Sequence, residues 1–169
     1  MQGIALSTTI SDCHVMNLPR IYDVRGSLTA ISNGQEIPFQ IKRTYHLYDV
    51  PGGAKRGGHA HRELQQLIIS VMGAFDVVLD DGRDKKPVRL DRAYYGLYVP
   101  AMIWRELINF SSGGICLVLA SDLYKEHEYI RDYGQFCRLK NTPEDSRPRP
   151  EIRSHPLARR PAPGSPVRH

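Results

Sequence analysis

The chain has 169 residues, which is enough for one domain with its own buried core and too few for two of ordinary size. Hydrophobic residues make up 41% and charged residues 24% of the sequence, values that are typical of globular proteins and exclude a fibrous or membrane-embedded class. The net charge of +5 is carried mostly by residues 141–169, where six arginines stand against three acidic residues, so the nearly balanced remainder predicts no nucleic-acid partner.

The N-terminal segment has no basic start followed by an unbroken apolar stretch, and no run of 18 apolar residues occurs in the chain. We therefore expect a cytoplasmic protein with no membrane partner. Cys13, Cys116 and Cys137 are far apart and form no CxxC pair. Neither a disulfide framework nor a thiolate zinc site is expected from them.

Short β-strands separated by turn residues are predicted up to about residue 125. Each apolar or alternating run ends at a Gly, Pro or Asp signal, such as the Pro51-Gly-Gly sequence or the Asp80-Asp-Gly sequence. The predicted strands, in chain order, are 41–48, 67–72, 74–79, 94–99 and 114–120. Many short strands with regular turns favour a sandwich or a barrel.

The segment 121–140 has a different period. Asp122 is a suitable N-cap, and several apolar residues after it recur at helical spacing, so one short helix is predicted in this segment. The residues with this spacing are Tyr124, Tyr129, Ile130 and Tyr133.

The end of the chain is rich in proline and arginine and has scarcely any large apolar side chain. Such a segment buries too little apolar surface to offset the entropy of ordering it. The sequence therefore predicts a single domain over residues 1–140, followed by a disordered tail over residues 141–169.

The pair His59 and His61 gives the clearest chemical signal in the sequence. With the glycines before and after them, they resemble the first motif of cupin jelly rolls, in which a glutamate stands where this chain has Gln66. The stretch from Pro100 to Asn109 is similar to the second cupin motif, with Arg105 in place of the usual histidine. The fold predicted is mainly β: a cupin-type double-stranded β-helix, or jelly roll, with a short C-terminal helix.

Two of the four usual cupin metal ligands are thus replaced. A guanidinium has no lone pair to donate and would repel a cation, so we expect no metal and no cofactor. His59 and His61 are predicted to point to the same face of a strand, where imidazoles can take and return a proton. A nearby guanidinium stabilises an enolate oxygen, which favours proton transfer next to a carbonyl. The alternative for both histidines is a structural role.

Several longer segments resemble the WxcM-like family of sugar-nucleotide 3,4-ketoisomerases, over about Asp23 to Arg138. The most specific are Arg56-Gly-Gly-His-Ala-His61 and Asp76-Val-Val-Leu-Asp-Asp-Gly82. The resemblance implies a homodimeric, metal-independent isomerase that moves the carbonyl of a dTDP-4-keto-6-deoxy-hexose from C4 to C3 through an enediolate. It also implies a place in the synthesis of 3-amino-3,6-dideoxy sugars.

Roles for individual residues follow from this resemblance together with the chemistry. His61 is expected to be the base, with His59 as its partner in shuttling protons. Arg56 and Arg105 are expected to hold the enediolate or the pyrophosphate, and Tyr45 to donate to a sugar oxygen. The remaining expected substrate-binding residues are Gln66, Arg25 and Arg43.

Arg25 and Arg105 occupy the two positions that the resemblance connects with the face of C4 that is reprotonated, and the product's C4 configuration stays open. Trp104 and Phe75 are expected to be core aromatics rather than a base-stacking platform. Two other functions remain as alternatives: a cupin-like sugar-nucleotide binding module without catalysis, and a metal-dependent cupin.

Overall fold

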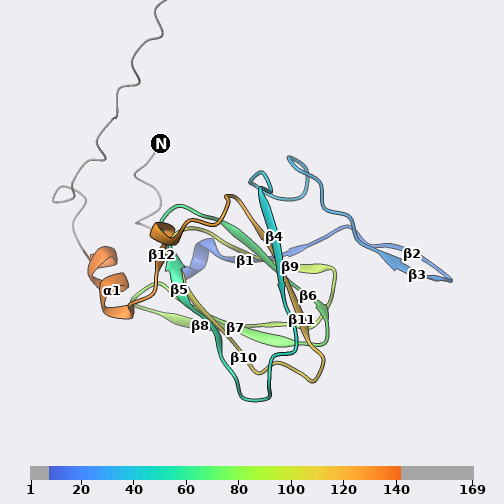
Figure 1. Cartoon of the computed structure of the whole chain (residues 1–169). Coiled ribbons are helices and arrows are strands. Elements are labelled where there is room, and N and C mark those ends of the chain that lie inside the picture. Colours follow the sequence, from blue (N-terminus) through green and yellow to red (C-terminus); the bar gives the residue numbers. More distant parts are fainter. Residues whose placement is uncertain (1–7, 142–169) are drawn as a thin grey trace, which may run out of the picture.

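Two five-stranded antiparallel sheets face each other in the computed structural model of the chain, which describes residues 8–141 (Figure 1). The first sheet has the order β1 (His14–Asn17), β9 (Tyr95–Val99), β6 (Gln66–Met72), β11 (Ile115–Ala120) and β4 (Arg43–Leu47). The second has the order β12 (Tyr129–Ile130), β5 (Arg56–His61), β10 (Trp104–Ile108), β7 (Phe75–Asp80) and β8 (Lys85–Leu90). The predicted jelly roll with a C-terminal helix is confirmed.

Three kinds of smaller element complete the described chain. A separate hairpin consists of β2 (Ile21–Asp23) and β3 (Gly26–Leu28), and it projects away from the sheets (Figure 1). Two short 3₁₀ turns and one α-helix make up the helical part: η1 (Ile10–Asp12), η2 (Glu126–Glu128) and α1 (Tyr133–Asn141).

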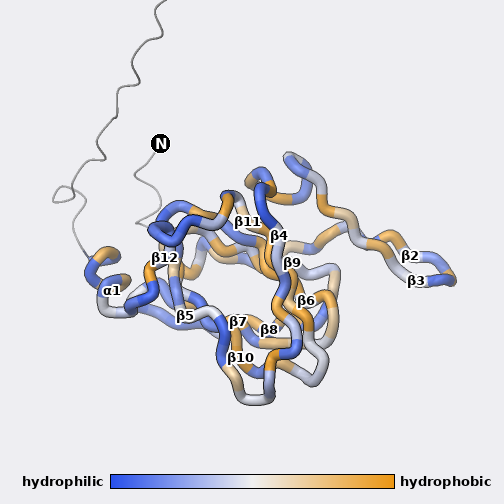
Figure 2. The backbone as a smooth tube through the Cα atoms, viewed as in Figure 1, coloured by the Kyte–Doolittle hydropathy of each residue, from blue (hydrophilic) through white to orange (hydrophobic). Residues whose placement is uncertain are grey.

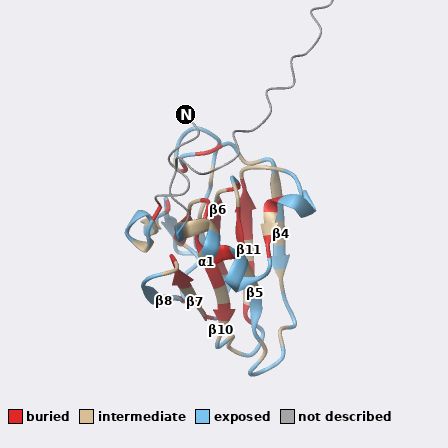
Figure 3. Cartoon of the chain, turned by 90° about the vertical axis from the view of Figure 1, so that its left-hand side faces the viewer, coloured by how far each residue is buried: buried red, intermediate tan, exposed pale blue. Residues whose placement is uncertain are grey.

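The core lies between the two sheets, because alternate side chains of every strand point inward. Ile68 and Val118 of the first sheet meet Val77 and Leu107 of the second, and all four are buried. Figure 2 shows apolar residues on the strands of both sheets, and Figure 3 shows that burial concentrates on the central strands β6, β10 and β11. Phe75 belongs to this core, as predicted.

All five predicted strands are present with small shifts of their ends. The predicted segments 41–48, 67–72, 74–79, 94–99 and 114–120 correspond in turn to β4, β6, β7, β9 and β11. The strands that the sequence did not predict include β8, an edge strand, and β10, which carries Arg105.

The predicted start of the helix is wrong. Tyr129 and Ile130 form β12, which pairs with the edge of β5, and α1 begins only at Tyr133. The N-cap expected at Asp122 is provided instead by Asp132, whose Oδ1 accepts a hydrogen bond of 2.6 Å from the backbone N–H of Gln135. Pairing with an open strand edge gives backbone N–H and C=O groups hydrogen-bond partners that are distant in the sequence. No local period in the sequence indicates such pairing.

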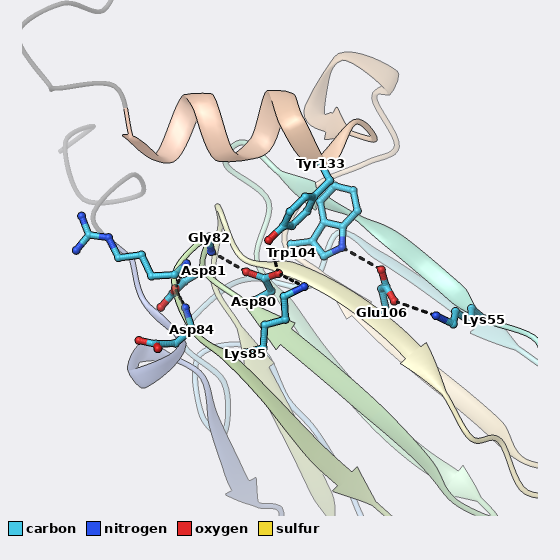
Figure 4. A network of polar contacts seen from close by, with 10 residues as sticks. Lys55, Asp80, Asp81, Gly82, Asp84, Lys85, Trp104, Glu106 and Tyr133 are labelled. Atoms are coloured by element: carbon cyan, nitrogen blue, oxygen red, sulfur yellow. Dashed lines mark hydrogen bonds and ion pairs between the residues drawn. The ribbon is translucent and has the colours of Figure 1, made fainter.

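The helix α1 covers the outer face of the second sheet. Phe136 has no exposed surface and lies 5.8 Å from Trp104, ring centre to ring centre, so Trp104 is buried as predicted. At the end of β7, Asp80 accepts a hydrogen bond of 2.8 Å from the Tyr133 hydroxyl and pairs with Lys85 at 3.0 Å (Figure 4). These contacts fix the helix on the sheet whose opposite face carries the histidines.

Figure 4 also shows that the Trp104 indole N–H donates to Glu106, which pairs with Lys55 at 4.0 Å.

The predicted tail, residues 141–169, lies outside the described residues except for Asn141, the last residue of α1. Within residues 8–141, no helix is long and apolar enough to cross a membrane.

Two motif positions show how the turns are held. Gly73 has φ of +67°, and a Cβ there would lie 2.3 Å from Ser111 Oγ, so only glycine fits. Met102 stands in a left-handed conformation as well, with φ of +59°, and its backbone N–H donates to the His61 carbonyl at 2.8 Å. This bond fastens the turn before β10 to the end of β5.

Candidate active site

A cavity of about 460 Å³ opens between the two sheets, lined by residues of β4, β5, β6, β10, β11 and β12. Its lining contains no carboxylate and five cationic side chains, which are Arg43, Lys55, Arg56, Arg105 and Arg131. Two of them are paired with carboxylates outside the lining, Lys55 with Glu106 at 4.0 Å and Arg131 with Glu126 at 2.9 Å. The other three have no ion pair within residues 8–141, so the cavity still favours an anionic ligand.

Arg105 is the most deeply placed of these cations, with only 3% of its surface exposed. Its guanidinium donates to the His59 carbonyl at 3.1 Å and to Gln66 Oε1 at 2.5 Å. Gln66 in turn donates from Nε2 to the Tyr45 hydroxyl oxygen at 2.8 Å. Burial lowers the pKa of Arg105 to about 10, so the side chain is still protonated at neutral pH.

His59 and His61 lie on the same face of β5, with ring centres 5.0 Å apart. Only His59 lines the cavity, because His61 is 1% exposed and is covered by Tyr129. Tyr129 is the cross-strand partner of His61 on β12, and the two ring centres are 4.3 Å apart. Nδ1 of His59 and both ring nitrogens of His61 have no hydrogen-bond partner within residues 8–141.

Both imidazoles are neutral at physiological pH. Burial, reinforced by the positive charge of Arg105, lowers the pKa of His59 to about 3. The same two causes, in the same order, lower the pKa of His61 further. A neutral imidazole can accept a proton, and negative charge from a bound ligand would raise its pKa toward neutrality.

Tyr129 and Arg131 line the cavity, and the sequence analysis did not assign them to the site. The Tyr129 hydroxyl accepts a hydrogen bond of 3.1 Å from Arg43, which connects β12 with β4 across the cavity. The Arg131 guanidinium lies 4.5 Å from the centre of the Tyr129 ring. No local pattern in the sequence identifies them as site residues, because the place of Tyr129 opposite His61 is set by the pairing of β12 with β5.

Most of the predicted site residues are brought together. Six of them line the cavity: Arg43, Tyr45, Arg56, His59, Gln66 and Arg105. His61 lies behind that lining. Arg25 is far from it in the chain's own fold, at the tip of the β2–β3 hairpin, where its exposed side chain pairs with Asp23 at 2.7 Å (Figure 1).

The residues at the cupin metal-ligand positions do not fit a cation. Gln66 Oε1 already accepts a hydrogen bond from Arg105, whose fixed positive charge occupies the position of the fourth ligand. The described residues contain no group of three or more His, Cys, Asp and Glu side chains that could hold a metal ion.

Two β-sheets with the histidines of β5 between them define a cupin. The chain belongs to the FdtA family, described as WxcM-like, C-terminal, because residues 11–141 match that family. A curated relative, the TDP-4-oxo-6-deoxy-alpha-D-glucose-3,4-oxoisomerase of Aneurinibacillus thermoaerophilus, is 45% identical over 122 residues, which cover 72% of this chain and 88% of the relative. The predicted family is confirmed.

Solved structures agree with this assignment. A 3,4-ketoisomerase from Helicobacter canadensis is 48% identical, with a TM-score of 0.76 over 78% of this chain and 98% of that one. The sugar 3,4-ketoisomerase QdtA of Thermoanaerobacterium thermosaccharolyticum, solved with TDP, is 34% identical, with a TM-score of 0.75 over 76% of this chain and 94% of that one.

Proposed function

We propose that the protein is a dTDP-4-keto-6-deoxy-hexose 3,4-ketoisomerase that works without a metal and supplies the synthesis of 3-amino-3,6-dideoxy sugars in the cytoplasm. The observation that carries the proposal is the cavity lining, which combines a neutral imidazole with five cations and no carboxylate. The cations suit a diphosphate, and the imidazole suits removal of a proton next to a carbonyl. The relatives named above support the same substrate class.

His59 is the proposed base, in place of His61, which the sequence favoured. The reason is access: His59 lines the cavity, whereas Tyr129 covers His61. His59 would remove the proton from C3 and return it to C4, while the charge of Arg105 stabilises the enediolate between the two steps. His61 lies against His59 and Tyr129 and would position both rings.

Substrate binding helps to prepare this base. The diphosphate would bring two negative charges to the rim formed by Lys55, Arg56 and Arg131. That charge offsets the Arg105 contribution to the low pKa of His59, so the imidazole becomes a stronger base when the substrate is bound.

We also propose that the protein is a homodimer joined through the β2–β3 hairpin. The hairpin exposes apolar side chains although it projects from the sheets, and an isolated two-stranded hairpin is marginally stable in water. These side chains are Ile21, Tyr22, Val24 and Leu28. A second copy of the chain would cover them, and Arg25 would then act at the cavity of that copy.

One experiment tests the function against its alternatives. The protein, treated exhaustively with a chelator, is incubated with dTDP-4-keto-6-deoxyglucose in D₂O, and deuterium incorporation at C3 and the product are followed by NMR. A ketoisomerase exchanges the C3 proton and forms the 3-keto sugar. Binding of dTDP without exchange would identify a binding module, and exchange that the chelator abolishes would identify a metal-dependent enzyme.

A further inference from the structure

Glu126 lies outside the cavity lining but binds two of the side chains that form it. Its carboxylate accepts hydrogen bonds of 2.9 Å from Nε and 3.1 Å from Nη2 of Arg131. The Tyr124 hydroxyl donates to the same carboxylate. Arg131 and Tyr124 both line the cavity. Glu126 is therefore placed to act on a ligand through these two neighbours.

The contacts of Arg131 fix both its position and its orientation. Its guanidinium lies 4.5 Å from the centre of the Tyr129 ring, and two bonds hold it to Glu126. A bidentate pair of this kind sets the direction of the planar group as well as its place. The hydrogen bonds from Arg131, with that from Tyr124, lower the pKa of Glu126 to about 2, so the carboxylate is charged at neutral pH.

This ion pair contributes little to the stability of the fold. The side chains of Glu126 and Arg131 are 62% and 52% exposed, and water screens the attraction between exposed charges. The pair does leave Arg131 able to bind something else. A guanidinium has five N–H donors, and Glu126 accepts from two of its nitrogens, so donors remain for a ligand in the cavity.

We propose that Glu126 is a positioning residue, which holds Arg131 at the cavity rim in the orientation that binds the diphosphate of the substrate. This inference rests on the proposed function. An arginine side chain is long and flexible, and ordering such a side chain on binding lowers affinity by about 2- to 10-fold. Because Glu126 orders Arg131 before the ligand arrives, binding avoids that loss.

Charge alone leads to the opposite expectation. A carboxylate beside the binding site of a diphosphate repels the ligand, so its removal should strengthen binding. Positioning predicts that its removal weakens binding, although the site then becomes more positive. The sign of the change in affinity therefore separates the two roles of Glu126.

The test is Glu126→Gln, with the affinity for dTDP measured by calorimetry. This ligand carries the diphosphate without the reacting sugar. The affinity should fall by about 2- to 10-fold, because Arg131 must then be ordered on binding. KM should rise by a similar factor, whereas turnover at saturating substrate should change much less. Unchanged or tighter binding of dTDP, in a variant whose melting curve matches the wild type, would overturn the inference.

A matched control comes from the same segment of the chain, between β11 and β12. Asp122 pairs with Lys42 and Lys125, neither of which lines the cavity. Asp122→Asn therefore removes a carboxylate of this segment without freeing a cation of the site, and it should bind dTDP as the wild type does. An equal loss of affinity in Asp122→Asn and Glu126→Gln would show that the effect is not specific to Arg131, and would contradict the inference.

A double variant tests whether Glu126 acts through Arg131. Arg131→Ala should weaken dTDP binding more than Glu126→Gln does, because it removes the contact itself. In the Arg131→Ala background, Glu126→Gln should cause no further loss, since the side chain that it positions is already absent. A full additional loss would overturn the inference. Absence of C3 exchange in a wild-type protein that binds dTDP would instead contradict the proposed function and leave the positioning result to be read from binding alone.

Discussion

His59 and His61 have similar surroundings but different access to the cavity. Both belong to β5, point to one face of it and are neutral because of burial and the Arg105 charge. The difference comes from the neighbouring strand, since Tyr129 lies across His61 and leaves His59 at the cavity. The motif that identifies the two histidines therefore does not say which of them meets the substrate.

Replacing each histidine with asparagine should separate their roles. Asparagine keeps a hydrogen-bonding group but cannot take up a proton at neutral pH, so His59→Asn should lower C3 exchange by about 10² to 10⁴. His61→Asn should lower it much less, because His61 acts by positioning. Exchange in D₂O and dTDP affinity are the measurements, and the affinity should be unchanged in both. Loss of exchange in His61→Asn alone would restore His61 as the base.

The same low pKa values predict a loss of stability in mild acid. In the unfolded chain a histidine binds a proton near pH 6.5, whereas folded His59 stays neutral down to about pH 3. The unfolded state then holds more protons, so the free energy of unfolding falls as the pH drops below about 6.5, by up to about 1.4 kcal/mol per pH unit for each such histidine.

Urea denaturation between about pH 5 and pH 8 measures how the free energy of unfolding changes with pH. His59→Asn should reduce this slope by the contribution of about one bound proton. Carboxylates contribute little in that window, because those with lowered pKa values, such as Glu126 at about 2, titrate below it. An unchanged slope in His59→Asn would mean that His59 is protonated in the folded protein.

Much of the site was visible in the sequence because cupin spacing places residues that are distant in the chain on neighbouring strands. His59, Gln66 and Arg105 meet at the cavity as their motif positions imply. Tyr129 was missed since its neighbours share a helical period, and its place opposite His61 is fixed by strand pairing. Such pairing depends on which strand edge is open, and that is a property of the folded sheet.

At the scale of elements, prediction succeeded where strands are central and apolar. β6 and β11 lie in the interior of the first sheet and consist largely of apolar residues. Their sequence alone therefore identifies them as buried strands. β8 lies at the edge of the second sheet, and its residues are mostly exposed and include Pro87. An edge strand tolerates proline and charge because only one side of it is paired.

The contact between α1 and the second sheet should depend on one side chain. Phe136 has no exposed surface and contacts Trp104, so Phe136→Ala should lower the free energy of unfolding by about 3 to 5 kcal/mol. Gln135→Ala, at an exposed position of the same helix, should change it by less than about 0.5 kcal/mol. Chemical denaturation of both variants makes the comparison. Equal, small effects would mean that the helix contributes little to stability.

The hairpin β2–β3 should decide the oligomeric state. Val24 is 96% exposed in the single chain. In the proposed dimer this side chain is covered, so Val24→Asp would place a charge in an apolar interface. We expect this variant to be monomeric in sedimentation equilibrium and to lose turnover, because Arg25 no longer reaches a second cavity. Val24→Leu keeps the apolar contact and should remain dimeric. A monomeric wild-type protein, or a dimeric and active Val24→Asp variant, would contradict the proposed assembly.

At the scale of the whole molecule, two groups of positive side chains differ in their setting. One is the cavity, where five cations are held by the sheets and by loops at the cavity rim, with no carboxylate in the lining. The other is the C-terminal tail, which contributes three of the five net charges. Fixed charge inside a concave site focuses the electrostatic field on an entering anion more effectively than charge outside such a site. Substrate binding should therefore depend on the first group and not on the second.

Removing residues 142–169 tests this separation. The family match and the helix α1 both end at residue 141, and the segment beyond it is rich in proline and poor in apolar residues. The truncated protein should keep the melting temperature, turnover and dTDP affinity of the whole chain. Its net charge should fall from +5 to +2, because six arginines and three acidic residues are lost, and it should elute earlier from a cation exchanger. Loss of soluble expression, or weaker dTDP binding at low salt, would show that the tail belongs to the domain or to its site.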